Sequence, residues 1–103
     1  MKNMKFLKEY REKFGVKEAV NEFGEHIQTT ENSIIFPNGL KASIINVENE
    51  PDTDKKYSVA VCDYDGFFDW QLLNPYGAVK GCIECDTELE IVIACETIRQ
   101  LTP

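Results

Sequence analysis

The sequence predicts an α+β fold in which an antiparallel sheet of about four strands carries an N-terminal helical pair and a C-terminal helix packed on one face. Apolar residues recur at helical spacing near both ends of the chain, and short β-branched runs occupy its middle. A Pro-Asn-Gly turn at residues 37–39 joins two of those runs at hairpin distance, which favours antiparallel pairing. The 103 residues predict one domain, residues 1–103, with a modest core.

Two apolar stripes predict that the first thirty residues form two short helices. Gly15 separates the stripes at a position typical of a helix C-terminal cap. The first stripe consists of Phe6, Leu7, Tyr10 and Phe14. The second stripe consists of Val16, Ala19, Val20, Phe23 and Ile27.

Short runs rich in β-branched residues predict the strands of the sheet. These runs lie at residues 33–36, 40–47, 57–64 and 79–85. After the third run, Asp65 and Gly66 predict a turn, and Asp69 is placed to cap a single helical turn over residues 70–73.

A capping-box pattern, Thr87 followed three residues later by Glu90, predicts the start of a closing helix. This helix is expected to run to about Leu101. Its expected buried side consists of Leu89, Ile91, Val92, Cys95 and Ile98.

The net charge of −7 is unevenly distributed along the chain. Residues 1–30 carry six Lys/Arg against five Glu, whereas residues 31–103 carry five Lys/Arg against thirteen Asp/Glu. An acidic surface repels phosphates, which argues against direct binding of nucleic acid, and it attracts basic protein surfaces. The alternative is that the acidic charge serves only to keep a small protein soluble.

Neither a signal peptide nor a membrane span is predicted, because no long uncharged apolar run is present. We therefore expect a cytoplasmic protein with no membrane partner. Thiols stay reduced in that compartment, so the four cysteines are expected to be free or metal-bound rather than bridged.

The Cys82-Ile83-Glu84-Cys85 step has a spacing at which two thiols can hold one zinc ion. Side chains alternate along a straight strand, so a shared ion requires a bend between Cys82 and Cys85. Cys62 and Cys95 complete the predicted ligand set of a structural zinc, with His26 as an alternative fourth ligand. Four ordinary buried cysteines, which behave as small apolar residues, are the alternative interpretation.

Residues 63–70 place three carboxylates and four aromatic rings in eight positions. Aromatic rings supply contact area at low entropic cost and carboxylates select a basic partner, so this segment is interpreted as a protein-binding epitope. The predicted contact residues are Asp63, Asp65, Phe67, Asp69 and Trp70. A nearby loop is expected to add steering charge through Glu48, Glu50, Asp52 and Asp54. The alternative is a hairpin whose rings mostly face the core.

Known catalytic patterns are missing from the sequence, which has one histidine and no nucleophile elbow, phosphate loop or zinc-protease helix. Residues 63–74 do not form a calcium loop, because Phe67, Phe68 and Asn74 occupy positions that need an oxygen ligand, glycine and glutamate. We therefore expect a protein without catalytic activity.

In size, acidity and α+β design the chain resembles the small accessory proteins of bacteriophages and mobile elements, and among them the anti-CRISPR inhibitors. The resemblance rests on these bulk properties and on the segment from Asp63 to Trp70. It implies a partner protein with a basic surface that handles nucleic acid, most specifically a CRISPR nuclease. Two alternatives are a cytoplasmic regulator that works through zinc or its thiols, and a small enzyme of unknown class.

Overall fold

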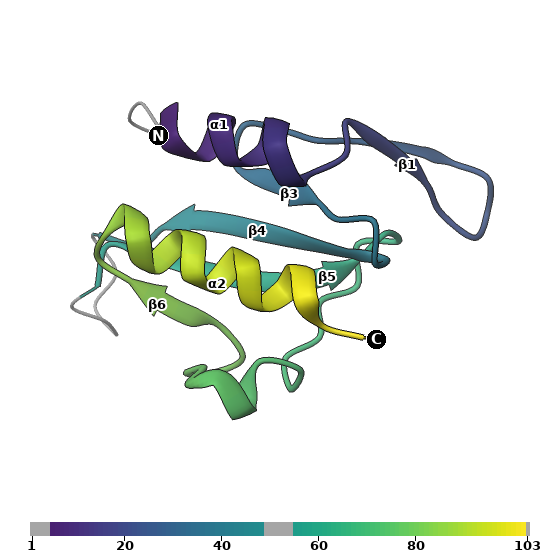
Figure 1. Ribbon diagram of the computed structural model, residues 1–103. Helices are drawn as coiled ribbons and strands as arrows, with labels where there is room; N and C mark the ends of the chain where they lie inside the picture. Colours follow the sequence, from purple (N-terminus) through teal and green to yellow (C-terminus); the bar gives the residue numbers. More distant parts are fainter. Residues whose placement is uncertain (1–4, 49–54, 103) are drawn as a thin grey trace.

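A four-stranded antiparallel sheet with the order β3-β4-β5-β6 forms the centre of the chain in a computed structural model (Figure 1). The structure describes residues 5–48 and 55–102. The four strands are β3 (Ser33–Ile35), β4 (Leu40–Asn46), β5 (Tyr57–Asp63) and β6 (Ile83–Cys85). The predicted α+β class and the four antiparallel strands are therefore confirmed.

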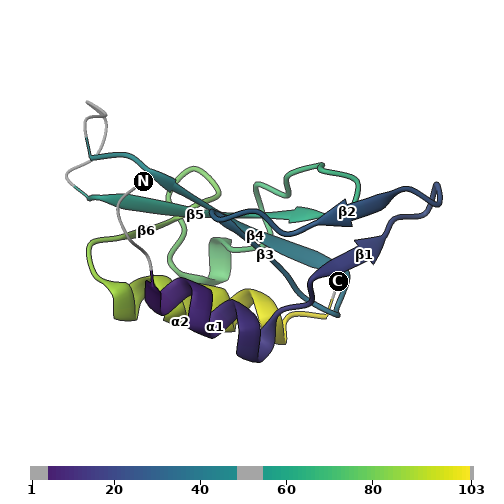
Figure 2. The same ribbon diagram turned by 90° about the horizontal axis from the view of Figure 1, so that it is seen from above.

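Both helices, α1 (Lys5–Phe14) and α2 (Glu88–Gln100), cover the same face of this sheet (Figure 2). The predicted capping box starts α2, because Thr87 Oγ1 accepts a hydrogen bond from Glu90 N at 3.2 Å and Glu90 Oε1 accepts one from Asp86 N at 3.2 Å. The core fills the space between the helices and the sheet. Its residues include Leu7, Ile34, Ala42, Ile44, Val59, Val61, Ile91, Cys95 and Ile98.

The predicted second helix of the N-terminal pair is wrong. Residues 18–28 instead form a two-stranded antiparallel sheet of β1 (Glu18–Val20) and β2 (His26–Gln28), which extends away from the main sheet (Figure 1). Two turn residues override the helical spacing of the apolar residues. Asn21 Oδ1 accepts hydrogen bonds from Phe23 N and Glu25 N, both at 3.0 Å, and Gly24 adopts a left-handed φ of 77°.

Smaller corrections concern residues 70–89. A tight turn at Lys80 and Gly81 divides the strand predicted over residues 79–85, because each takes a positive φ and Val79 pairs with Cys82 across the turn. The single helical turn is a 3-10 helix at Asn74–Tyr76, and Asp69 lies five residues before its start. Leu89, expected on the buried side of α2, is exposed.

The turn between β3 and β4 also caps the C-terminus of α2. Asn38 Nδ2 lies 2.8 Å from Ile98 O, 3.1 Å from Arg99 O and 3.0 Å from Leu101 O. Ile98 O also accepts from Leu101 N at 3.2 Å, and the amide adds a side-chain donor to the carbonyls at this end of the helix. Asn38 thereby joins a sheet turn to a helix about sixty residues later in the chain.

A cluster of three hydrogen-bonded side chains joins α1 to α2. The Tyr10 hydroxyl donates a hydrogen bond to Glu96 Oε2, and Arg99 donates to both oxygens of that carboxylate, at 2.5 and 2.9 Å. The Arg99 guanidinium also lies 4.8 Å from the centre of the Phe14 ring. The hydrogen bond from Arg99, followed by the one from Tyr10, lowers the pKa of Glu96.

We expect Asn38→Ala to lower the free energy of unfolding by about 1–2 kcal/mol, because it removes the side-chain donor from the carbonyls at the end of α2. Asn38→Asp should cost at least as much, since it places a carboxylate at the negative end of the helix dipole. Urea unfolding followed by circular dichroism measures both changes. Asn74→Ala, which truncates an exposed side chain that makes no hydrogen bond in the described parts of the chain, is the control and should change stability by less than about 0.5 kcal/mol. Equal effects at the two positions would contradict the capping role.

Glu96 should make folding more favourable above the pKa that it has in the unfolded chain. Its folded pKa is lowered, so this contribution is fully present near neutral pH and is lost as the pH falls through the folded pKa. Glu96→Gln should therefore be less stable than the natural chain at pH 7, and the difference should shrink towards pH 3. Unfolding curves of both proteins between pH 3 and pH 7 test this, and a constant difference would refute it.

Candidate protein-binding surface

The turn that follows β5 is held by the side chain of Asp63. Asp63 Oδ1 accepts hydrogen bonds from Asp65 N at 2.9 Å and from Phe67 N at 3.0 Å. The backbone closes the same turn, because Asp63 N donates to Phe67 O at 3.0 Å and Gly66 N donates to Asp63 O at 3.2 Å. The predicted Asp-Gly turn is confirmed, and it has a fixed backbone.

The chain then returns along β5 for two residues. Phe68 forms an antiparallel bridge with Cys62, and Asp69 N donates to Val61 O at 3.0 Å. The Asp69 carboxylate accepts hydrogen bonds from Gln71 N and Leu72 N, both at 3.0 Å, which starts the next turn. The segment that carries Phe68 and Trp70 is thus fixed by hydrogen bonds on both sides.

The rings of Phe68 and Trp70 stack on each other in contact with solvent. Their centroids are 5.0 Å apart and their planes differ by 9°. The exposed fractions are 72% for Phe67, 42% for Phe68 and 53% for Trp70. The three rings are therefore outside the core, and we call Phe67, Phe68 and Trp70, together with Asp63, Asp65 and Asp69, the aromatic patch.

Gly81 packs closely against Trp70 of the aromatic patch. A Cβ atom at this position would lie 2.8 Å from both Cα and O of Trp70, and the φ of Gly81 is 86°. Any larger residue would displace the Trp70 backbone. The tight turn at residues 80–81 therefore sets the place of the indole ring.

Asp65 differs from the other two carboxylates of the patch. Its Oδ1 atom is buried and accepts no hydrogen bond within the described parts of the chain. A buried carboxylate oxygen without a donor is unfavourable.

Glu48, the one predicted steering residue within the described parts of the chain, lies away from the aromatic patch. Asn46 pairs with Tyr57 at one end of the β4–β5 ladder, whereas Asp63 pairs with Leu40 at the other, six residues or about 20 Å away. Glu48 follows β4 and is exposed at the far end from the aromatic patch. Glu50, Asp52 and Asp54 lie outside the described residues.

The four predicted zinc ligands are not brought together. In the register of the sheet, Cys85 lies opposite Tyr57 and faces the helices with Cys95. Tyr57 faces the helices in the same way, and side chains alternate along β5. Cys62, five residues after Tyr57, therefore lies on the opposite face of the sheet. Cys82 also lies on that face, because the chain turns before Cys82 and not between Cys82 and Cys85. One ion could reach all four sulfurs only if the sheet opened.

Within residues 5–48 and 55–102, no group of three or more His, Cys, Asp or Glu side chains is arranged to hold a metal ion. His26, the alternative ligand, is exposed on the separate hairpin. Burial raises the pKa of Cys62, that of Cys85 to about 11 and that of Cys95 to about 12, with nearby acidic groups adding to the last two. The thiolate that would bind a metal or react is therefore disfavoured at these three positions.

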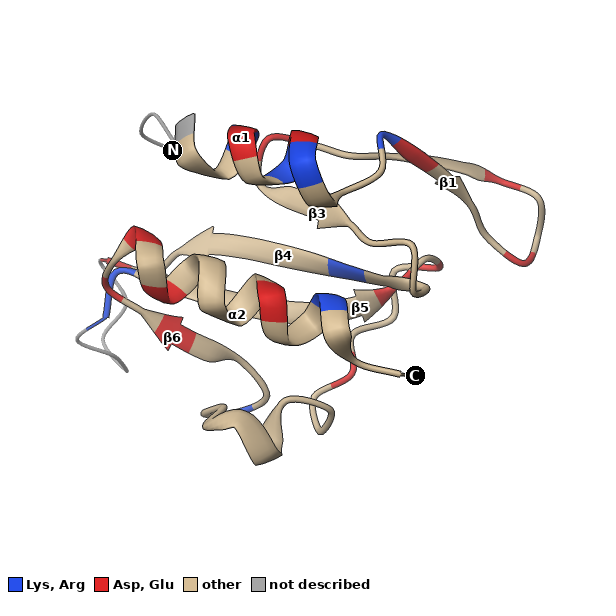
Figure 3. Cartoon of the chain, in the orientation of Figure 1, with Lys and Arg blue, Asp and Glu red and all other residues tan. Residues whose placement is uncertain are grey.

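Sequence analysis missed the exposed apolar residues of the β1–β2 hairpin because it assigned them to the buried side of a helix. Phe23 is 71% exposed at the hairpin turn, and Val20 is also exposed. The Asn21-x-x-Gly24 spacing was the available signal, because both residue types favour turns. Acidic residues mark this hairpin along β1 and around its tip (Figure 3).

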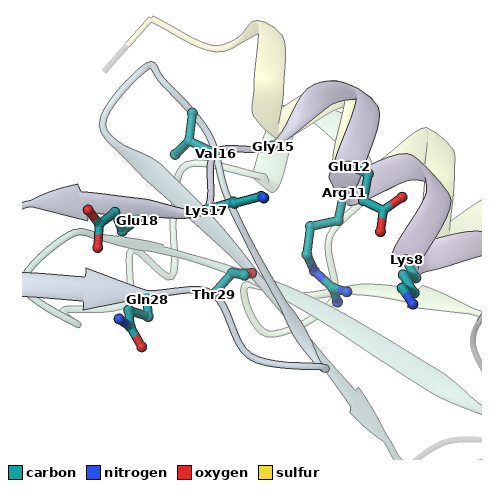
Figure 4. Close-up of a pocket in the computed structure, with 9 residues that line it drawn as sticks. All are labelled: Lys8, Arg11, Glu12, Gly15, Val16, Lys17, Glu18, Gln28 and Thr29. Atoms are coloured by element: carbon teal, nitrogen blue, oxygen red, sulfur yellow. The ribbon is translucent and has the colours of Figure 1, made fainter.

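A groove of about 840 Å³ lies between α1 and the base of the β1–β2 hairpin (Figure 4). Its walls carry the cations Lys8, Arg11 and Lys17 and the carboxylates Glu12 and Glu18. Gly15, Val16, Gln28 and Thr29 complete the lining. Arg11 is held in place, since its Nε donates to Ser33 O at 2.8 Å and its Nη2 to Glu31 O at 2.7 Å.

Comparison of the chain with models of protein families, with curated proteins and with solved structures found no match. No helix in the described part of the chain is long and apolar enough to cross a membrane. The aromatic patch and the acidic charge are the features of this chain that point to a function.

Thiol labelling at pH 7 should modify Cys82 first, because Cys82 is partly exposed and the other three cysteines are buried. We expect Cys62, Cys85 and Cys95 to react at least about tenfold more slowly, since each needs local unfolding and carries a raised pKa. Time-resolved reaction with DTNB, in the native state and in denaturant, measures this. Cys82→Ser should remove the fast phase, and two or more fast thiols in the native protein would contradict the placement.

Proposed function

We propose that this protein is a non-catalytic inhibitor that binds a basic, nucleic-acid-handling surface of a partner enzyme through the aromatic patch. A CRISPR nuclease is the most specific candidate for that partner. The observation that carries the proposal is the stacked pair of Phe68 and Trp70, exposed to solvent on a hydrogen-bonded backbone. Exposed rings on small proteins are usually functional when they form a patch, and Trp is enriched at the centres of interfaces.

The rigidity of the patch supports binding in a preformed shape. Asp63 and Asp69 accept four backbone hydrogen bonds around the rings, so little conformational freedom remains to be lost on association. The same carboxylates belong to the segment that carries the rings, so negative charge is close to them along the chain. A guanidinium group suits this combination, because it stacks on an indole and pairs with carboxylates.

The overall charge favours the same class of partner. A net charge of −7 speeds association with a basic surface and repels free nucleic acid. Only Glu48 of the four proposed steering residues can be placed, and it lies at the far end of the sheet from the patch. In this proposal the net negative charge of the whole chain therefore supplies the long-range attraction to the basic partner.

A cytoplasmic setting is part of the proposal. All four cysteines are free, which suits a reducing compartment. Neither zinc nor a reactive thiol is needed for binding through the aromatic patch.

The test is inhibition of DNA cleavage by a panel of purified CRISPR nucleases, with affinity for any inhibited nuclease measured by calorimetry. Trp70→Ala and Phe67→Ala should each weaken binding by about tenfold or more, because each removes a large ring from the contact. Leu89→Ala, which truncates an exposed apolar side chain on α2, is the control and should bind like the natural chain. Affinity of the natural chain should also fall between 50 and 300 mM salt.

Absence of inhibition and binding across the panel would refute the assignment to CRISPR nucleases. Binding that tolerates Trp70→Ala, or that is unchanged by salt, would refute the role of the aromatic patch.

A further inference from the structure

The β1–β2 hairpin forms an arm whose apolar tip contacts little of the rest of the chain. We call residues 17–29 the hairpin arm. β1 and β2 pair with each other, and neither joins the four-stranded sheet. Phe23 at the tip is as exposed as Phe67 of the aromatic patch, at 71% against 72%. A two-stranded hairpin of this kind is marginal in water, so contact with another surface at its tip would stabilise the arm.

The two ends of the hairpin arm carry opposite charge. Glu22 and Glu25 are exposed at the tip. Lys8, Arg11 and Lys17 line the groove at the base, where they outnumber the carboxylates Glu12 and Glu18. Figure 3 shows the same separation, with acidic residues around the tip and basic residues near the end of α1 and just before β1. In an acidic chain this basic groove is complementary to the tip of the arm.

The tip cannot reach the groove of its own chain. Five residues separate Lys17 at the base from Glu22 at the tip, which spans about 17 Å of extended strand. A second copy can satisfy the contact when the two arms lie antiparallel across a two-fold axis. Each tip then meets the base of the other arm, and an outer edge of the arm lies beside the same edge of the second copy, since β1 and β2 pair with no other named strand.

We propose that the chain forms a homodimer by reciprocal docking of the hairpin arms, with Phe23, Glu22 and Glu25 of each copy seated in the groove of Lys8, Arg11 and Lys17 of the other. The groove volume of about 840 Å³ falls in the range of sites that enclose small ligands, so an aromatic ring and its flanking side chains fit there. Arg11 is held by carbonyls of residues 31 and 33 and presents a fixed charge. This dimer does not depend on the aromatic patch or on its partner.

Sedimentation velocity at 150 mM salt, over protein concentrations from about 1 µM to 1 mM, tests the dimer. At this ionic strength, repulsion between the acidic bodies is screened beyond about 8 Å. Phe23→Ala should raise the dimer dissociation constant by about tenfold for each of its two copies in the interface. Phe67→Ala is the matched control, because it removes an equally exposed ring from the aromatic patch, and it should leave the dissociation constant unchanged.

Charge reversal gives a sharper test, because mixing two variants that do not dimerise alone should restore a dimer. The tip variant Glu22→Lys/Glu25→Lys and the groove variant Lys8→Glu/Lys17→Glu should each be monomeric alone, since tip and groove then carry like charges. In an equimolar mixture each tip faces a groove of opposite charge, so the heterodimer should form. Glu48→Lys and Lys56→Glu, single charge reversals at exposed positions away from the arm, are the controls and should dimerise like the natural chain.

Rescue on mixing also shows that both variants are folded. A natural chain that stays monomeric up to 1 mM would overturn the proposal. A dimer that is unaffected by Phe23→Ala, or two reversed variants that do not associate with each other, would overturn the interface. These outcomes are distinct from failure of the proposed function, which is read from Trp70→Ala and Phe67→Ala.

Discussion

The apolar contact between α2 and the central strands β4 and β5 holds the fold together, and polar groups at both helix ends set its position. Apolar packing alone would let a helix slide along a sheet, because it has no direction. Thr87 and Glu90 fix the first turn of α2, and Asn38 fixes its last carbonyls to the β3–β4 turn. Through Glu96, α2 in turn positions Tyr10 and therefore α1. The hairpin arm comes last in this sequence of contacts, since it follows α1 and pairs only with itself among the strands.

The aromatic patch follows from the same packing. The chain between β5 and β6 first returns along β5, where Phe68 pairs with Cys62, and is then anchored by Leu73, which is buried in the core. The Tyr64 hydroxyl donates to Phe36 O and ties the start of this segment to the end of β3. Phe68 and Trp70 lie two residues apart in extended backbone, so they point to the same side and stack. The rings are exposed because the backbone that carries them is anchored on both sides.

Sequence analysis could predict α1, the strands and the start of α2 because their signals are local: apolar spacing, the Asn-Gly turn and the capping box. It failed at residues 16–28, where the same apolar spacing is compatible with helix or hairpin and Asn21 and Gly24 decide between them. It could foresee that Cys82 and Cys85 alternate in a strand, but the face that Cys62 takes depends on register between strands. It identified the residues of the aromatic patch, whereas the support by Gly81 depends on a contact across eleven residues.

The positions of the two proposed surfaces determine how they can work together. One row of paired residues crosses the sheet from Val16, before the hairpin arm, through Lys41 of β4 to Phe68 of the aromatic patch. The row spans four strand spacings, or about 19 Å, so the arm and the patch lie at opposite edges of the sheet. Docking of two arms would therefore leave both patches free and pointing away from the two-fold axis. A dimer of this kind presents two copies of the stacked rings, and a partner with two basic sites at a matching distance would bind it more tightly than either patch alone, without any new contact.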